Sequence, residues 1–245
     1  MEPIPNNPAG RIHLLMINAK ALANQTTGQQ FPILLDYPPN DTIAMHRRFA
    51  AVLNEIDEAE HLLKNFDPQL HAMFMGDRQS VVNFFSVGIN PSVDWNQYKT
   101  QHLREEALRT LQFWSLALSR MSPERETTAE ALADFEKKLN DLYSYVAESD
   151  LDPALKGRIL GGLNDIRNSI HEYRIVGLKA LEKAVAAFGV EVHSTEESGS
   201  VTSPSWPDIY DKLSTFVDGA TKGFALWEKI RPLREMVKQF LLPTS

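Results

Sequence analysis

The chain has 245 residues, 43% of them hydrophobic and 23% charged, and this ordinary composition argues against both a wholly disordered chain and a membrane protein. Its formal net charge of −7 disfavours non-specific binding to a nucleic-acid backbone. The absence of cysteine excludes disulfides, thiolate metal sites and cysteine nucleophiles. The first residues lack the basic and apolar regions of a secretory signal, and no apolar run could span a bilayer, so we expect a cytoplasmic protein without membrane contact.

The first three quarters of the chain are predicted to be helices separated by turn residues. Residues 1–9 contain three prolines and two asparagines, which is typical of a flexible arm. Residues 10–189 are predicted to form a helical bundle. Within them, apolar residues recur at steps of three and four, which fits an amphipathic helix and not a strand. The pattern predicts helices over residues 9–24, 42–65, 95–121 and 127–149.

Local signals refine these elements. The apolar run at residues 31–35 fits either a buried extended segment or one helical turn, since periodicity cannot separate the two at this length. Asp67 precedes a proline and begins another helix, with a possible break near Gly76. Thr127, with Glu130 three residues later, has the pattern of a capping box and predicts a helix start.

Residues 151–188 carry the longest helical pattern of the chain. Asp152 is a good N-cap, the following proline suits the first helical position, and Gly189 is predicted to end the helix. Gly177 stands where an aliphatic residue would be expected, so we predict either close packing or a kink there. The predicted buried face consists of Leu155, Ile159, Leu163, Ile166, Ile170, Tyr173, Leu181, Val185 and Phe188.

The C-terminal quarter begins with a change of composition. Residues 190–205 are rich in serine, threonine and glutamate and are predicted to be a linker. Residues 206–245 are predicted to be a helical unit that packs either on the bundle or on a partner. Its aromatic stripe, the predicted partner-binding surface, consists of Phe216, Phe224 and Trp227, and a basic flank follows at Arg231, Arg234 and Lys238.

One polar pattern on the long helix suggests chemistry. Arg167 and His171 are four residues apart and share a helix face, where an arginine could stabilise phosphate charge and a histidine could transfer a proton. The pattern resembles the motif of HEPN-type ribonucleases, in which an arginine precedes a histidine on a helix of an all-helical bundle. In the toxin branch of that family a tyrosine follows two residues after the histidine, as Tyr173 does here. The family usually places at least four residues between the two catalytic side chains, whereas this chain has three.

A second polar pattern lies at Glu58, Glu60 and His61. Glu-x-x-His on a bundle helix is one half of a di-iron carboxylate site, but no other histidine of the chain has a glutamate three residues before it. Asp57 and His61 could hold a metal alone, and a solvated acidic face is the simpler interpretation.

The sequence therefore predicts an all-α protein, an irregular antiparallel bundle of about seven helices with a tethered C-terminal helical unit. We favour a non-enzymatic interaction or regulatory module without cofactor or metal, whose partner is a protein, either a second copy or another chain. The alternatives are a metal-independent ribonuclease using Arg167, His171 and Tyr173, for which alone a nucleic acid would be the partner, and a bundle that binds a metal or a small molecule.

Overall fold

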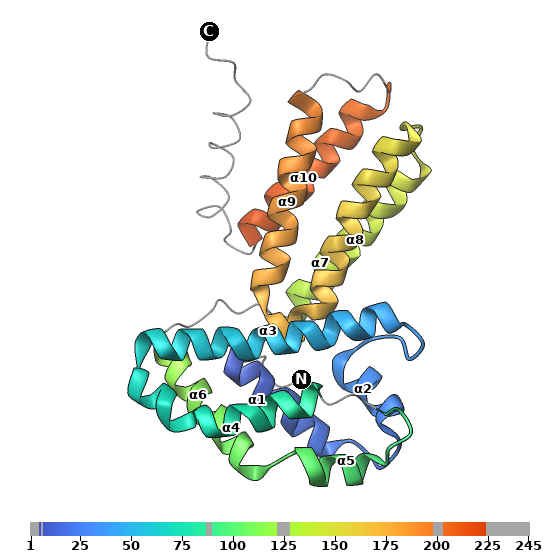
Figure 1. The fold of residues 1–245 in the computed structure, drawn as a ribbon. Helices are drawn as coiled ribbons and strands as arrows, with labels where there is room; N and C mark the ends of the chain where they lie inside the picture. The colour runs from blue at the N-terminus through green and yellow to red at the C-terminus, as the bar shows by residue number, and fades with distance from the viewer. Residues whose placement is uncertain (1–4, 6, 87–89, 122–127, 198–202, 224–245) are drawn as a thin grey trace. The chain divides into compact units, whose positions relative to one another are not determined.

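The computed structural model describes residues 5, 7–86, 90–121, 128–197 and 203–223 (Figure 1). Over these residues the secondary structure consists of ten α-helices and no strand, which confirms the predicted all-α class. None of the described helices is both long enough and apolar enough to cross a bilayer. The described residues fall into two compact units. Unit 1 contains residues up to 121 together with 172–178, and unit 2 contains residues 128–171 and 179–223.

Six helices make up most of unit 1, and polar caps begin three of them. Asn7 accepts a hydrogen bond from the backbone N–H of Gly10, at 2.8 Å, and Asp41 and Asp94 cap their helices in the same way. Because Asn7 is fully buried, the predicted flexible arm is already part of the fold at its end. The helices are α1 (Pro8–Ala21), α2 (Thr27–Leu35), α3 (Thr42–Phe66), α4 (Pro68–Ser86), α5 (Trp95–His102) and α6 (Glu105–Met121).

An aromatic cluster forms the centre of unit 1. Phe31 of α2 lies edge-on to Trp95 and Tyr98 of α5, with ring centroids 5.2 and 5.5 Å apart, and Phe84 of α4 packs beside them. The polar atoms of the cluster are paired. The indole N–H of Trp95 donates to the backbone carbonyl of Ala19, and the hydroxyl of Tyr98 donates to the backbone carbonyl of Phe84. A core of large rings with satisfied polar tips is rigid and strongly stabilising.

Three predicted elements of unit 1 differ from the observed ones. The helix predicted over residues 95–121 is two helices that separate at Leu103, because α5 packs in the aromatic cluster while α6 packs mainly on α1 and α4. The run at residues 31–35 lies in a full helix that begins earlier, where Thr26 and Gln29 form a capping box. The chain does not break at Gly76, which lies within α4.

Residues 172–178 connect α8 (Pro153–Val176) to α9 (Leu178–Glu197) and are held in unit 1 by charged side chains. Arg11, which is 2% exposed, pairs with Glu55 at 2.5 Å and donates through Nε to the carbonyl oxygen of Ile175 at 3.1 Å. The carboxylate of Glu172 pairs with Arg47 and Arg48 at 2.7 and 2.8 Å. Burial lowers the pKa of Arg48. Buried charges that are paired in this way tie the connection to α1 and α3.

Unit 2 consists of α7 (Ala129–Glu148), the larger part of α8, α9, and α10 (Trp206–Gly223). Each helix packs against the next. Lys156 of α8 donates to the carbonyl of Ala147 on α7, the backbone of α8 at Gly162 lies against Phe188 of α9, and Gly189 of α9 lies against Val217 of α10. Finally α10 packs back on α7, and Figure 1 shows the four helices running side by side.

The long helix predicted over residues 151–188 is interrupted, and its predicted end is wrong. Gly177 has a φ of 63°, a left-handed conformation that suits glycine, and it separates α8 from α9. Gly189 lies inside α9, where a Cβ atom would come within 2.9 Å of Val217, so its role is close helix packing. Residues 190–197 of the predicted linker are therefore helical, and residues 198–202 lie outside the described residues.

Two smaller predictions in unit 2 also change. The residue that caps α7 is Thr128, whose hydroxyl accepts from the N–H of Ala131. The cap lies one residue after the predicted Thr127, and because Ala131 has no side-chain acceptor, Thr128 does not form the predicted capping box. Thr127 itself lies outside the described residues. Ile170 is half-buried, whereas the neighbouring Ser169 is buried and donates to the carbonyl of Asp165.

Candidate functional site

Unit 2 contains a groove of about 800 Å³ between α7 and α10, which we call the α7/α10 groove. Its floor is apolar and is built from both helices. The aromatic rings of Phe135 and Phe216 stack there, with centroids 5.0 Å apart and an angle of 15° between their planes. Phe135 is buried, whereas Phe216 is only half-buried, so one stacked ring remains open to the groove. Leu142 and Ala220 complete the floor.

Small residues widen one end of the groove. Ala131 from the start of α7 and Gly219 and Ala220 from the end of α10 line it there. A Cβ atom added to Gly219 would meet no described heavy atom within 4 Å. An approaching backbone could therefore come close to α10 at this end, as small residues permit wherever helices pack tightly.

The rim of the groove is charged, and its lysines are already paired. Lys138 makes an ion pair with Asp134 at 2.7 Å, and Lys212 lies 3.9 Å from Asp208. Asp141 and Asp211 also line the groove and make no ion pair with a described residue. The rim therefore has more negative than positive charge available to a ligand.

Tyr145 closes the other end of the groove. Its hydroxyl donates to Asp208 of α10, and the ammonium of Lys212 lies 4.9 Å from the centre of its ring. The hydrogen bond to Asp208 raises the pKa of Tyr145, because the neighbouring carboxylate favours the protonated phenol. Tyr145 thus stays neutral and links the two helices at the end opposite Gly219.

The residues of the ribonuclease hypothesis are not gathered around an open site. The guanidinium of Arg167 donates to Asn140 of α7 at 2.8 Å and to Asn164 at 3.1 Å, and it lies 4.6 Å from the centre of the Tyr143 ring. His171 is exposed, whereas Tyr173 is buried and belongs to unit 1. These contacts orient Arg167 toward α7, and the hypothesis stays a prediction.

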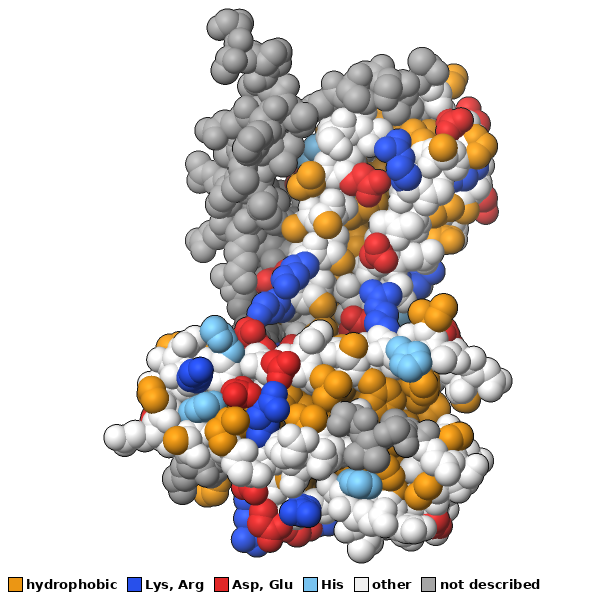
Figure 2. Space-filling view, in the orientation of Figure 1, with side chains coloured by type: hydrophobic (Ala, Val, Ile, Leu, Met, Phe, Trp, Pro, Cys, Tyr) orange, Lys and Arg blue, Asp and Glu red, His pale blue; other side chains and the backbone are white. Residues whose placement is uncertain are grey.

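The described residues of α8 and α9 that face the viewer in Figure 2 form no concentrated basic surface. Figure 2 shows lysine and arginine side chains interspersed with aspartate and glutamate over α8 and α9, in the orientation of Figure 1. Such alternation is typical of a solvated helix face. Binding to a nucleic-acid backbone depends instead on clustered positive charge.

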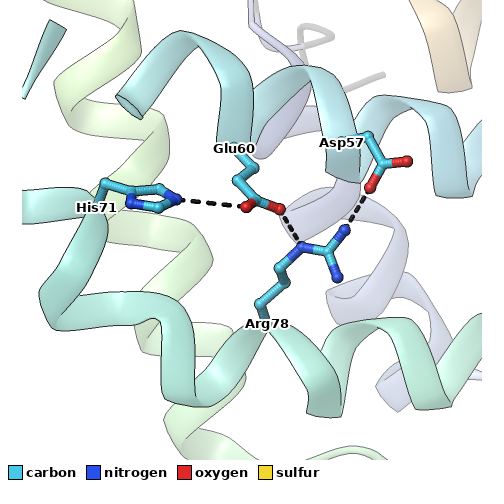
Figure 3. Close-up of polar contacts among 4 residues, drawn as sticks. All are labelled: Asp57, Glu60, His71 and Arg78. Atoms are coloured by element: carbon cyan, nitrogen blue, oxygen red, sulfur yellow. Dashed lines mark hydrogen bonds and ion pairs between the residues drawn. The ribbon is translucent and has the colours of Figure 1, made fainter. Parts of the chain in front are cut away.

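The acidic segment at the end of α3 is engaged in ion pairs with α4. Arg78 contacts both Asp57 and Glu60, and the second carboxylate oxygen of Glu60 faces His71 at 3.4 Å, as Figure 3 shows. His61 points elsewhere and lies 2.9 Å from the amide of Asn65. No group of three or more histidine, aspartate or glutamate side chains among the described residues is arranged to hold a metal ion. The network thus connects two helices and does not present free ligands.

The α7/α10 groove overlaps only in part with the predicted partner-binding surface. Phe216 lines the groove, while Phe224 and Trp227 lie outside the described residues. Phe135 and Gly219, which also line the groove, were not among the predicted site residues. The apolar periodicity of α7 could have pointed to Phe135, whereas Gly219 has no signal in the sequence.

Known proteins give no further guide to the site. No family model, curated protein or solved structure matches the chain.

Proposed function

We propose that this protein is a non-enzymatic protein-interaction module that binds an amphipathic helix of a partner protein in the α7/α10 groove. The observation that supports it most is the open apolar floor, where the half-buried ring of Phe216 stacks on Phe135. Aromatic side chains are enriched at the cores of protein interfaces, where a few well-packed residues supply most of the binding energy.

The dimensions of the groove favour a helix as the ligand. The lining of α7 extends from Ala131 to Tyr145, which corresponds to roughly 20 Å at 1.5 Å per residue. A ligand helix of about four turns would span that length, with apolar anchors at positions i, i+3 or i+4 and i+7. The small residues at one end would let its backbone approach α10 closely.

The charges favour a partner helix with basic flanks. The α7 helix carries five acidic and two basic residues, and α10 carries three acidic and two basic residues. Asp141 and Asp211 lie at the rim, where lysine or arginine of a ligand could reach them. Complementary rim charges act mainly on the rate of association and on the choice of partner, so we expect binding to weaken as salt rises.

Site-specific photo-crosslinking tests this proposal. The photoreactive amino acid p-benzoylphenylalanine is placed at Phe216 of the full chain in its native cells, and separately at Ile33, an exposed aliphatic residue of unit 1 that is 61% accessible. We expect a crosslink to a peptide of a second protein at position 216 but not at position 33, with that peptide forming an amphipathic, basic helix; a crosslink within the chain itself does not count as support.

Binding of that peptide is then measured with matched variants of the full chain. Gly219→Arg adds a bulky cation inside the groove, and Gly161→Arg adds the same side chain to α8, where a Cβ atom also meets no described atom. The proposal predicts that Gly219→Arg weakens binding at least tenfold and that Gly161→Arg leaves it unchanged. A peptide that binds both variants equally, or the lack of any crosslink specific to position 216, would refute it.

A further inference from the structure

The C-terminal segment, residues 224–245, has the chemistry that the α7/α10 groove requires of its ligand. Large apolar residues recur in it at helical spacing on both sides of Pro232, which can begin a new helix. The segment has four basic and two acidic residues. The apolar residues at this spacing are Phe224, Trp227, Ile230, Leu233, Met236, Val237, Phe240 and Leu241.

From this match we infer that the C-terminal segment docks in the α7/α10 groove of its own chain, as an internal ligand that a partner helix must displace. The inference rests on the proposed function, because the C-terminal segment would regulate the binding of a partner helix in the same groove.

The point where α10 ends makes the docking geometrically possible. The last residue of α10 is Gly223, four residues after Gly219, which lines the small-residue end of the groove. The C-terminal segment therefore leaves α10 at the mouth of the groove. After a reversal of direction within residues 224–232, a helix over residues 233–245 would measure roughly 20 Å, the length of the α7 lining.

Charge supports the same occupant. The basic residues Arg234 and Lys238 are four apart, so on a helix they share one side. Asp141 of α7 and Asp211 of α10 lie on opposite sides of the groove and make no ion pair with a described residue. A docked helix could bring its basic side to one of them while its apolar side covers Phe216.

Covalent attachment makes even a weak internal ligand effective. A ligand on a short flexible connection has an effective concentration on the order of 1 mM. A segment with a Kd of about 0.1 mM would then fill the groove for about nine tenths of the time and weaken an external helix about tenfold. Partner binding would thus be restricted to helices that bind more tightly than this segment does.

Hydrogen–deuterium exchange of the full chain, read by mass spectrometry over residues 224–245, tests this inference. The reference is a synthetic peptide of the same residues. We expect the amides of the segment to exchange at least tenfold more slowly in the full chain than in the peptide. Gly219→Arg should bring their exchange to within about threefold of the peptide, whereas Gly161→Arg should leave the protection unchanged.

A second groove variant, Thr215→Arg, guards against a local loss of structure at Gly219. Thr215 is exposed and lines the groove, so this change also obstructs the site. Unchanged exchange in α9 would show that unit 2 remains folded in each variant.

Two results in the exchange experiment at one concentration would overturn the inference, and a third would come from dilution. One is exchange in the full chain as fast as in the peptide, and the other is protection that persists in both groove variants. Protection that disappears on dilution would also overturn it, because the groove would then hold the segment of a second copy. None of these results bears on crosslinking at position 216, so a failure here is distinguishable from a failure of the proposed function.

Discussion

Two phenylalanines show how the two units of this protein differ. Phe31 in unit 1 is 1% exposed and has Phe49, Phe84, Trp95 and Tyr98 as ring neighbours. Phe216 in unit 2 stacks on Phe135 and keeps part of its surface open to the α7/α10 groove. The same residue type thus closes a core in one unit and forms an accessible floor in the other. The difference teaches that a phenylalanine on the apolar face of a helix can complete a closed core, as in unit 1, or remain accessible at a groove, as at the site that we propose for binding in unit 2.

The charged groups follow the same division. Arg11 in unit 1 is buried against Glu55 and the Ile175 carbonyl, whereas the pair of Lys138 and Asp134 at the groove rim is about two-thirds exposed. Removing one partner of a buried ion pair leaves the other charge buried without compensation, which is strongly destabilising. An exposed ion pair contributes little to the stability of the fold.

The largest effect is therefore expected for Arg11→Met. It removes the Arg11 guanidinium from the buried Glu55 carboxylate and from the Ile175 carbonyl, and we expect it to lower the free energy of unfolding by about 3–5 kcal/mol. Lys138→Met should change it by less than about 1 kcal/mol. Urea denaturation measures both, and the double variant Arg11→Met/Glu55→Leu should recover a large part of the loss. Equal losses of unfolding free energy in Arg11→Met and Lys138→Met would contradict the distinction between the buried pair of unit 1 and the exposed pair of unit 2.

A comparably large effect is expected in the aromatic cluster. Phe31→Ala should cost about 3–5 kcal/mol of unfolding free energy, since the ring is fully enclosed. Phe216→Ala should cost less than half as much, because the ring is already partly hydrated. Thermal unfolding followed by circular dichroism distinguishes the two, and a larger loss for Phe216→Ala would mean that the groove is a core.

Two glycines of unit 2 allow the stability of a packed position to be compared with that of an open position within one unit. A Cβ atom at Gly162 would lie 2.5 Å from the ring of Phe188, which is itself 2% exposed, so Gly162→Ala should cost about 1–3 kcal/mol. At Gly219 the added methyl group meets open space, and Gly219→Ala should stabilise α10 by about 0.5–1 kcal/mol. Chemical denaturation measures the sign of each change. A destabilising Gly219→Ala would show that the groove end is filled.

The helices were largely predictable from sequence, because their apolar residues repeat at steps of three and four. The positions at which the helices break were not predictable from sequence. Gly177 could have been a packing residue or a kink, and its left-handed conformation accompanies a hydrogen bond from Arg11, 164 residues away, to the neighbouring Ile175 carbonyl. At Gly189 the expected stop is absent because Val217 of α10 packs against the glycine within α9. Such distant contacts leave no local signal.

The candidate site was predictable only at Phe216. An aromatic stripe can be read from the spacing of one helix, but the groove depends on α7 and α10 meeting across about 80 residues of chain, which no periodicity encodes. The spacing of Arg167 and His171 was visible in the sequence. Whether the pair could act on a phosphate depends on where the two side chains point, which spacing does not give. Arg167 is held by Asn140 and Asn164, contacts that sequence spacing did not reveal.

The smallest effect is expected in a ribonuclease assay. Because Arg167 is bound to α7 and Tyr173 is buried, we expect purified protein to leave single-stranded RNA uncleaved in the absence of metal. Arg167→Ala and His171→Ala should then change nothing in this assay. Robust cleavage that disappears with either substitution would move the functional site from the groove to α8.

The most direct test of the binding role of unit 2 is the affinity of the helix captured at position 216 for three forms of the full chain, measured by fluorescence anisotropy. Wild type and Gly161→Arg should bind the labelled helix equally, and Gly219→Arg should bind it at least tenfold more weakly. Equal affinity for all three forms would contradict the assignment of the α7/α10 groove as the binding surface.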